Sequence, residues 1–252
     1  MWTEAESIAL VRAGTVPLAV LSAEAQQKML RGDRGDGEIG PIVAQQIAAA
    51  EDFKQHVAAE DKRVKKLLLS TGITDAEKAD RAEAHWFLVG DQRRGDFLIW
   101  CYVWRHNIGP AAYGRVLADS WNRPKVGSLA TRWGLGWKLV NDMFLSADQH
   151  HLMDDAEFDF FKVLPDRITV YRGSGNNVTA ARAARGMSWT LDRGKAEWFA
   201  QRDGDGFCIK AEVPKRNVFA YFDGRNEQEV VIRYASVRKF EQIAEHVEAD
   251  AA

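Results

Sequence analysis

Apolar residues in the first half of the chain recur at helical spacing and predict a succession of helices. The spacing over residues 42–70 predicts one long amphipathic helix with charges on its opposite face, and residues 1–30 also show helical spacing. Thr74 followed by Glu77 has the form of a capping box, which predicts another helix running through Trp86. The first half of the chain is therefore expected to be mainly helical.

A second group of segments leads to a turn-rich break. The polar stretch 91–96 is expected to end the helix before it. The apolar stretch 97–106 fits a buried helix or a strand, because periodicity does not distinguish the two. Pro110 begins a further helix, since proline is favoured at the first helical position. Residues 122–136, rich in Gly, Pro and Arg, are the best candidate for a domain boundary.

The pattern changes after Pro165. Helices are expected from Trp137 to about His151 and around residues 156–164. Short β-type runs then alternate with turn signals at residues 168–172, 206–213, 218–221 and 229–234. We therefore expect an α+β protein, with a mainly helical N-terminal domain (1–135), a mixed domain (136–246) and a short tail (247–252).

Composition indicates an ordinary globular protein. Of 252 residues, 46% are hydrophobic and 28% charged, and the net charge of −2 does not demand nucleic acid or an anionic membrane as partner. A local basic groove remains compatible with that total, because net charge reports on solubility rather than on sites. Cys101 and Cys208 lie in apolar runs and are expected to be buried free thiols. No stretch approaches the roughly 18 apolar residues of a membrane span, so a cytoplasmic location is expected.

Neighbouring histidines raise the question of a metal site. His150 and His151 stand close to three aspartates, but adjacent residues of a helix point about 100° apart and rarely bind one ion. We therefore expect no metal.

Arg172 ends the predicted strand 168–172. Period-two alternation places Ile168, Val170 and Arg172 on one face, and the two apolar residues are expected to pack in the core. Arg172 then lies where that face reaches an opening, and Gly173 begins a flexible loop that allows close approach of a ligand. Arginine binds phosphate through two parallel hydrogen bonds. A strand-end arginine paired with a carboxylate is the alternative interpretation.

Ser188 and Thr190 lie two residues apart. In an extended segment their hydroxyls share one face and Trp189 occupies the other. Asp192 is a predicted N-cap, and the helix after it has a buried stripe of Ala196, Phe199 and Ala200. Capping of the helix entry is the alternative role of the two hydroxyls.

Glu227 and Glu229 precede a Val/Ile run that predicts a strand. If both lie in that strand, their carboxylates share a face with Cα atoms roughly 7 Å apart, at about 3.3 Å rise per residue. Two like charges this close are unfavourable unless solvent, a cation or a substrate compensates them. An exposed acidic face on an edge strand is the alternative.

Three segments occur together in one order, and this favours a functional interpretation of each over the structural alternative. They are Tyr171-Arg172-Gly173, Ser188-Trp189-Thr190 before a helix with Trp198-Phe199-Ala200, and Arg225-Asn-Glu-Gln-Glu-Val-Val. This pattern resembles the arginine–serine–glutamate class of mono-ADP-ribosyltransferases, which includes toxin and phage enzymes, from about residue 137 to 240. Trp189 replaces the threonine common at the centre of the second motif, and its side chain is expected to face away from the hydroxyls.

The resemblance implies a fold, a substrate and roles for individual residues. The fold would be a core of two small packed β-sheets with flanking helices, and NAD would be the substrate, with nicotinamide released. Glu229 would be the catalytic carboxylate that binds the ribose 2′-hydroxyl, and Glu227 would orient and help deprotonate the nucleophile. Ser188 would brace Glu229, and Thr190 would shape the nicotinamide pocket. The implied NAD-binding residues are Arg172, Gly173, Ser188, Thr190, Tyr171 and Phe199.

The acceptor of ADP-ribose stays open among several classes. Glutamate at position 227 makes an arginine side chain of a protein the first candidate by resemblance, with a nucleic-acid base, a small molecule or water as alternatives. Tyr221, Phe222 and Arg225 would meet the acceptor, since aromatic faces stack on a guanidinium or a base. An ordinary turn between two strands is the alternative.

The resemblance leaves the biological setting open as well. It is compatible with a toxin, a phage factor or an antiphage defence protein acting in a host cytosol. The helical half would recognise a target, bind an antitoxin or inhibitor, or shield the cleft. A binding module that keeps the fold without catalysis is the non-enzymatic alternative.

Overall fold

The computed structural model describes residues 39–123, 129, 133–202 and 204–243. The chain divides into two compact units, residues 1–65 and 66–252. The long helix predicted over 42–70 is confirmed as α3 (Ile39–Leu68), while the helix predicted over 1–30 lies outside the described residues. The domain boundary predicted between residues 135 and 136 lies inside the second unit and stays a prediction.

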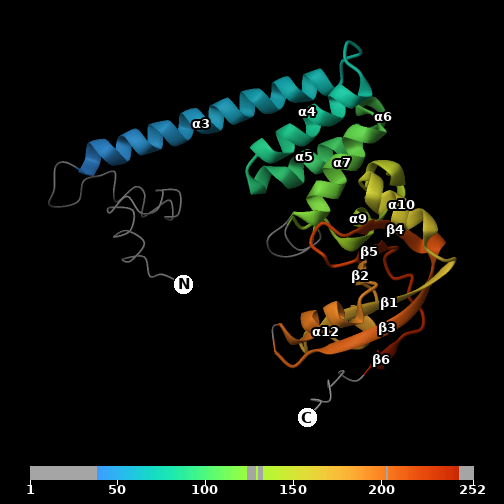
Figure 1. Ribbon diagram of the computed structural model, residues 1–252. Helices are drawn as coiled ribbons and strands as arrows, with labels where there is room; N and C mark the ends of the chain where they lie inside the picture. The colour runs from blue at the N-terminus through green and yellow to red at the C-terminus, as the bar shows by residue number, and fades with distance from the viewer. Residues whose placement is uncertain (1–38, 124–128, 130–132, 203, 244–252) are drawn as a thin grey trace. The chain divides into compact units, whose positions relative to one another are not determined.

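Helices α4 (Asp75–Leu88) and α7 (Pro110–Asn122) pack together in the helical layer of the second unit (Figure 1). The predicted capping box of α4 is confirmed: Thr74 Oγ1 accepts from the Glu77 N–H at 3.2 Å, and the Glu77 carboxylate accepts from the Thr74 N–H at 2.8 Å. The Trp86 indole N–H donates to Ser120 Oγ at 2.8 Å, which links α4 to α7. The predicted start of α7 at Pro110 is also confirmed.

The stretch 91–96 begins a helix. The preceding helix does end at Leu88, as predicted, but α5 (Asp91–Val103) runs through this stretch and is followed by the short α6 (Arg105–Ile108). The expected turn at 91–96 and the strand alternative for residues 97–106 are therefore wrong. Gly95 lies inside α5, and a side chain there would clash with Trp133, because a Cβ at position 95 would be 2.6 Å from Trp133 Cγ. A glycine costs a helix about 1 kcal/mol in propensity, and here it makes room for a tryptophan ring.

Three short helical segments lead from the helical layer to the sheet. They are α9 (Trp137–Leu145), the 3-10 turn η2 (Gln149–His151) and α10 (Asp155–Val163). The side-chain amide of Gln149 donates to the carbonyls of Val218 at 3.0 Å and Phe219 at 3.1 Å. These bonds fasten η2 to the first residues of an outer strand, and α10 packs against the same strand.

The described strands form one antiparallel sheet in the order β4-β5-β2-β1-β3-β6. Their bounds are β1 (Arg167–Ser174), β2 (Ser188–Thr190), β3 (Phe207–Pro214), β4 (Val218–Phe222), β5 (Glu229–Ile232) and β6 (Glu241–Ile243). Helices and an antiparallel sheet in successive parts of the chain confirm the α+β class. The four predicted β-type runs are strands, whereas β6 was not predicted and β2 was recognised only as an extended approach to a helix.

The sheet consists of two three-stranded halves that meet at one residue pair. β1 pairs with β3 along its whole length but with β2 only at Tyr171 opposite Thr190. The expected pair of separate packed sheets is not confirmed, since backbone pairing connects all six described strands.

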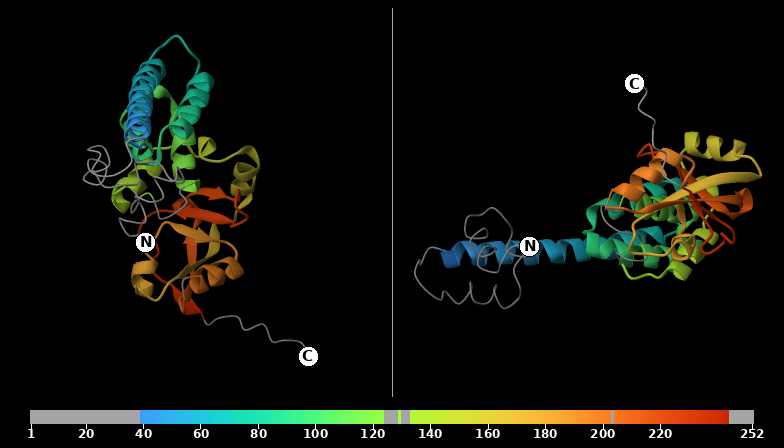
Figure 2. Two further views of the ribbon diagram at one scale, coloured as in Figure 1. Left: turned by 90° about the vertical axis from the view of Figure 1, so that its left-hand side faces the viewer. Right: turned by 90° about the horizontal axis from the view of Figure 1, so that it is seen from below.

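Helix α12 (Arg193–Gln201) lies against one face of the β1–β3 half (Figures 1 and 2). The predicted N-cap is confirmed, because the Asp192 carboxylate accepts from the Lys195 N–H at 3.2 Å. A Cβ on Gly173 would lie 1.9 Å from the Ala196 carbonyl oxygen, so only glycine permits this close approach. The short α11 (Ala180–Ala183) and η3 (Lys215–Asn217) complete the connections. None of the described helices combines the length and apolar character that crossing a membrane requires.

Candidate active site

Three of the predicted site residues lie on neighbouring strands in the middle of the sheet. Arg172 is in β1, Ser188 in β2 and Glu229 in β5, and β2 lies between the other two strands. Thr190 is the residue opposite both Tyr171 and Glu229. Because adjacent strands are about 4.8 Å apart, segments distant in sequence are brought close together here.

The Arg172 guanidinium faces β2 and is only partly satisfied by the protein. Its Nη1 donates to the backbone carbonyl of Ser188. Arg172 as a residue is half-buried, but its Nε atom is fully buried and has no hydrogen-bond partner among the described residues. Burial lowers the pKa of Arg172, and the nearby Glu229 carboxylate opposes that change. A buried donor without an acceptor costs about 1–3 kcal/mol, so an acceptor supplied by a ligand would be favourable at this atom.

Gly186 lies directly against that guanidinium. A Cβ at this position would be 2.7 Å from Arg172 Cζ and 2.9 Å from both terminal nitrogens. The Gly186 carbonyl also accepts a hydrogen bond from the Trp189 indole N–H at 3.0 Å. The absence of a side chain at Gly186 thus leaves the space that Arg172 fills. Sequence analysis did not single out this glycine, because its neighbour is 14 positions away in the printed sequence.

Glu229 is a buried carboxylate held by donors from three elements. It is only 6% exposed. The Trp121 indole N–H, at the end of α7, donates to Glu229 Oε1 at 3.1 Å. The Ser188 hydroxyl also forms a hydrogen bond with this carboxylate. Arg225 Nη2 lies 3.6 Å from Glu229 Oε2 and forms an ion pair with it.

The environment of Glu229 acts on its pKa in both directions. Burial raises the pKa above the ordinary value for glutamate, and the neighbouring Glu227 charge adds to this. The hydrogen bonds from Ser188 and Trp121 and the charge of Arg225 oppose the shift by favouring the ionised form. A buried carboxyl group with opposing influences of this kind is typical of functional sites.

Glu227 lies in the loop between β4 and β5, outside the strand. The flanking residues Asn226 and Gln228 are left-handed, with φ of 53° and 45°, so the strand alternation assumed for the two glutamates is wrong. Arg225 brings the two carboxylates into one cluster instead. Its Nη2 is 2.8 Å from Glu227 Oε2 and 3.6 Å from Glu229 Oε2. One cation therefore compensates both charges.

The loop that carries Glu227 is fastened to the end of β2. Thr190 Oγ1 donates to the Glu227 carbonyl at 2.6 Å and accepts from the Asp192 N–H at 3.0 Å. The Leu191 N–H donates to the Gln228 carbonyl at 3.0 Å. Thr190 is 5% exposed and its hydroxyl is engaged with backbone. It thus positions the glutamate loop, whereas the expected role in a nicotinamide pocket stays a prediction.

The remaining predicted NAD-binding residues have other surroundings. Gly173 lies within β1 beneath α12 and does not begin a flexible loop, since the helix packs directly on it. Tyr171 is half-buried, opposite Lys210 and Thr190. The Phe199 ring lies 5.0 Å from that of Trp198, its neighbour in α12.

The predicted acceptor-binding aromatics lie in β4 and are buried. Tyr221 is 5% and Phe222 4% exposed, and the Tyr221 ring lies 4.3 Å from that of Phe160 in α10. Both residues lie in the strand and the loop begins only at Asp223, so their expected contact with the acceptor stays a prediction. Arg225, with a side chain 49% exposed, is the predicted acceptor-binding residue that does lie in this loop.

Trp121 is the site residue that sequence analysis missed. Its ring packs edge-on against Phe144 at 5.1 Å, and Phe144 in turn stacks on Phe219 at 5.7 Å. Its contact with Glu229 spans 108 positions and leaves no spacing signal in the sequence. Its bond shows that the helical layer takes part in the candidate site.

No group of three or more side chains able to hold a metal ion occurs among the residues that the structure describes. Comparison with protein-family models, with curated proteins and with solved structures gives no match for this chain. Its candidate function therefore depends on the site alone.

Proposed function

We propose that the chain is an NAD-dependent mono-ADP-ribosyltransferase with its active site around Arg172, Ser188 and Glu229. The observation that carries the proposal is that β5, β2 and β1 are neighbours, so the three motifs of the resemblance lie side by side. The division of the sheet into two halves joined by one pair is compatible with the two-sheet core expected for such enzymes.

The residues present fit NAD at this site. The orphaned Nε of Arg172 offers a charged donor to a phosphate or ribose oxygen, and arginine is well suited to that role. When bound, NAD supplies a glycosidic bond to nicotinamide whose cleavage leaves positive charge on the ribose, as in glycoside hydrolysis.

Glu229 would stabilise that developing charge. A carboxylate already oriented by Trp121, Ser188 and Arg225 needs little reorganisation when charge appears beside it, which lowers the barrier. A carboxylate has about four lone-pair sites, so a ribose hydroxyl would still find an acceptor there. Low exposure keeps the surroundings weakly screened and strengthens the interaction.

Glu227 would receive the acceptor. Its carboxylate forms an ion pair with the Arg225 guanidinium over 2.8 Å, so the geometry accommodates a guanidinium at this position. This supports arginine side chains as the first acceptor class. Glu227 would orient the attacking nitrogen and take up its proton as general base.

The test is incubation of the full chain with labelled NAD and a cell lysate, with Glu229→Ala in parallel. Label that enters protein and is lost in the variant would support the proposal. Label in nucleic acid would retain the enzyme class and replace the acceptor. Free ADP-ribose as the sole product would indicate an NAD glycohydrolase. An absence of NAD turnover would refute the proposal and favour a binding module.

Two further variants separate the roles within the site. Arg172→Ala is expected to abolish nicotinamide release while the chain stays folded. Glu227→Gln is expected to lose transfer to the acceptor and to retain some NAD hydrolysis, because water needs less assistance in positioning than a macromolecular nucleophile. Equal loss of both reactions in Glu227→Gln would contradict a role confined to the acceptor.

A further inference from the structure

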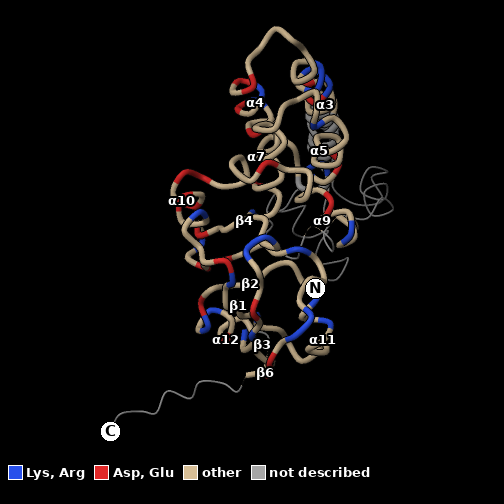
Figure 3. Tube along the Cα trace, turned by 90° about the vertical axis from the view of Figure 1, so that its right-hand side faces the viewer, with Lys and Arg blue, Asp and Glu red and all other residues tan. Residues whose placement is uncertain are grey.

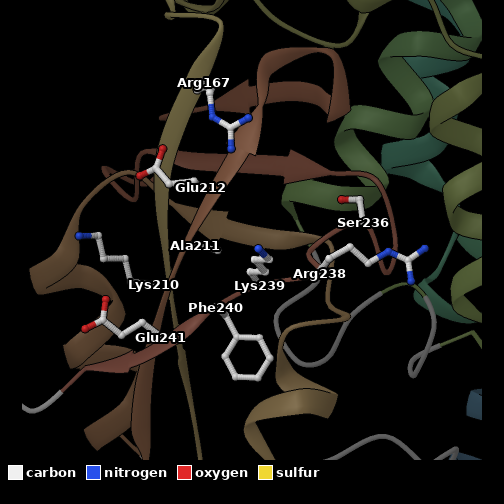
Figure 4. Close-up of a pocket in the computed structure, with 9 residues that line it drawn as sticks. All are labelled: Arg167, Lys210, Ala211, Glu212, Ser236, Arg238, Lys239, Phe240 and Glu241. Atoms are coloured by element: carbon white, nitrogen blue, oxygen red, sulfur yellow. The ribbon is translucent and has the colours of Figure 1, made fainter.

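A second candidate site lies beside β3, next to the segment that leads into β6. Between the β1–β3 strands and residues 236–241 there is a hollow of about 530 Å³ (Figure 4). This volume is in the range of pockets that hold small ligands, about 300–1,000 Å³. β6 pairs with β3 only at residues 208–210, so the hollow opens where the approaching segment diverges from β3.

Basic side chains surround the hollow. Four of its lining residues are cations, namely Arg167, Lys210, Arg238 and Lys239. In Figure 4 the Arg167 and Lys239 side chains point toward the middle of the hollow, and Arg238 lies at its rim. Figure 3 shows the positive stretch that runs into β6. Four cations around one hollow in a chain of net charge −2 are a local concentration of positive charge.

These cations form no ion pair with the carboxylates beside them in the described residues, although Glu241 is opposite Lys210 in the strand register. Among the described residues, none of the four cations takes part in an ion pair or a side-chain hydrogen bond. The two carboxylates at the hollow are those of Glu212 and Glu241, and Glu212 accepts a hydrogen bond from the Thr169 hydroxyl. With four cations and two carboxylates, the lining keeps an excess of positive charge that favours an anion.

The hydroxyl of Ser236 provides a second, independent observation. Ser236 is one of the residues that line the hollow, and its hydroxyl oxygen is buried without a hydrogen-bond partner among the described residues. Figure 4 shows this oxygen directed to the same side as Arg167 and Lys239. Buried polar groups are nearly always satisfied, so this hydroxyl has an unused donor that a bound anion would satisfy.

The hollow is distinct from the site around Arg172. Residues paired across antiparallel strands have side chains on the same face, and successive residues alternate between faces. Arg172 pairs with Ile209, whereas Lys210 pairs with Tyr171 and Glu212 with Thr169. Lys210 and Glu212 therefore lie on the face opposite Arg172, whereas Ala211, paired with Val170, lies on the Arg172 face. None of the residues that line the hollow belongs to the cluster of Arg172, Ser188 and Glu229, so a ligand in the hollow does not depend on the function proposed above.

We propose that this hollow binds the phosphate groups of an anionic ligand, with Arg167, Lys239 and the Ser236 hydroxyl as its central contacts. Arginine and lysine are the cations that recognise phosphate, and a neutral hydroxyl donor completes the coordination of its oxygens. Cations at the rim as well as the centre suit more than one phosphate. The ligand is a phosphodiester strand or a free di- or triphosphate, which share this chemistry.

The test measures binding of two probes to the full chain. One is a fluorescein-labelled 12-nucleotide single-stranded RNA, and the other is unlabelled pyrophosphate as competitor. Each phosphate contact contributes about 0.7 to the slope of log affinity against log salt for a single strand. Arg238→Glu/Lys239→Glu is therefore expected to reduce that slope by about 1.4 and to weaken binding at least tenfold. Displacement of the RNA by micromolar pyrophosphate would identify free polyphosphates as the source, and resistance to millimolar pyrophosphate would identify the strand.

Two controls protect the conclusion from general charge effects and from misfolding. Lys138→Glu/Arg216→Glu makes the same change in net charge at exposed positions outside the hollow, and its RNA affinity should change less than twofold. Ser236→Ala is expected to weaken binding about tenfold without lowering the melting temperature, because its hydroxyl has no protein partner to lose.

Three outcomes would overturn the proposal. The first is equal RNA affinity in the hollow variant and the charge-matched control. The second is a fall in melting temperature with unchanged binding in Ser236→Ala, which would show a structural hydroxyl. The third is equally tight binding of a poly-glutamate peptide, which would assign the hollow to carboxylates.

Discussion

Replacing Trp121 with phenylalanine tests whether the helical layer holds an ionised Glu229. The substitution removes the indole N–H that donates to Glu229 Oε1 over 3.1 Å and keeps an aromatic ring against Phe144. A hydrogen bond to a charged group contributes about 1.5–3 kcal/mol, and one between neutral groups about 0.5–1.5 kcal/mol. We therefore expect Trp121→Phe to cost about 1.5–3 kcal/mol of unfolding free energy at pH 9. In a Glu229→Gln background, where the acceptor is neutral, the cost should be about 0.5–1.5 kcal/mol.

The assay is urea unfolding of the four proteins of this cycle, followed by far-ultraviolet circular dichroism. Trp86→Phe is a matched control, because its indole N–H donates to the neutral Ser120 hydroxyl over 2.8 Å. Trp86→Phe should therefore cost the same unfolding free energy whether residue 229 is glutamate or glutamine. An equal cost of Trp121→Phe in both backgrounds would refute the idea that this bond stabilises a carboxylate.

The same bond has a consequence for activity under the proposed function. At about 1.4 kcal/mol per factor of ten, a loss of about 1.5–3 kcal/mol corresponds to a fall in NAD turnover of about 10- to 150-fold. Loss of the donor also raises the pKa of Glu229 further, since Trp121 favours the ionised form. The acid limb of the pH–rate profile should therefore move to higher pH in Trp121→Phe. A lower rate with an unmoved limb would indicate a merely structural effect.

Three further predictions concern the same cluster. The pKa of Glu229 is raised in the folded state, so ionisation of this carboxyl destabilises the fold as pH rises from the pKa of the unfolded state through that of the folded state. Glu229→Gln should therefore raise the melting temperature at pH 8, and the gain should disappear below about pH 4.3. A gain that persists in acid would exclude this cause. Gly186→Ala should displace the Arg172 guanidinium and lower NAD turnover about 100-fold with little change in melting temperature, whereas full activity would show that the guanidinium adapts. Arg225→Gln should free Glu227 to bind the guanidinium of agmatine, used here as a small acceptor. The KM for agmatine should fall by at most about fivefold, the equivalent of the roughly 1 kcal/mol that a half-exposed ion pair contributes. A raised KM would show that Arg225 binds the acceptor instead.

Local signals predicted local structure well. The Thr74–Glu77 capping box and the Asp192 N-cap are both confirmed, because each depends on hydrogen bonds within a few residues. The stretch 91–96 shows where this approach fails. Its glycine argues against a helix by propensity, but Gly95 leaves space for the Trp133 side chain, a contact that spans 38 positions and that no local pattern reveals.

The candidate site divides in the same way. The order of strands could not be obtained from the three motifs, and it is this order that places Arg172, Ser188 and Glu229 together. The arrangement of the two glutamates was predicted wrongly, because period-two alternation assumes a continuous strand and Gln228 is left-handed. The cation needed between two carboxylates was expected in general terms, and Arg225 supplies it.

Donors from three elements hold the Glu229 carboxylate, and this determines how the site responds to substitutions. Trp121 comes from α7, Ser188 from β2 and Arg225 from the loop before β5, so removing one donor leaves two that still favour the charge. Single substitutions should therefore have partial effects, and combined ones should exceed their sum once too few donors remain for a buried carboxylate. A chain cut at the predicted boundary after residue 135 would lose Trp121 while keeping every residue of the resemblance. The helical layer is thus a source of catalytic geometry under the proposed function, in addition to any role in binding a target.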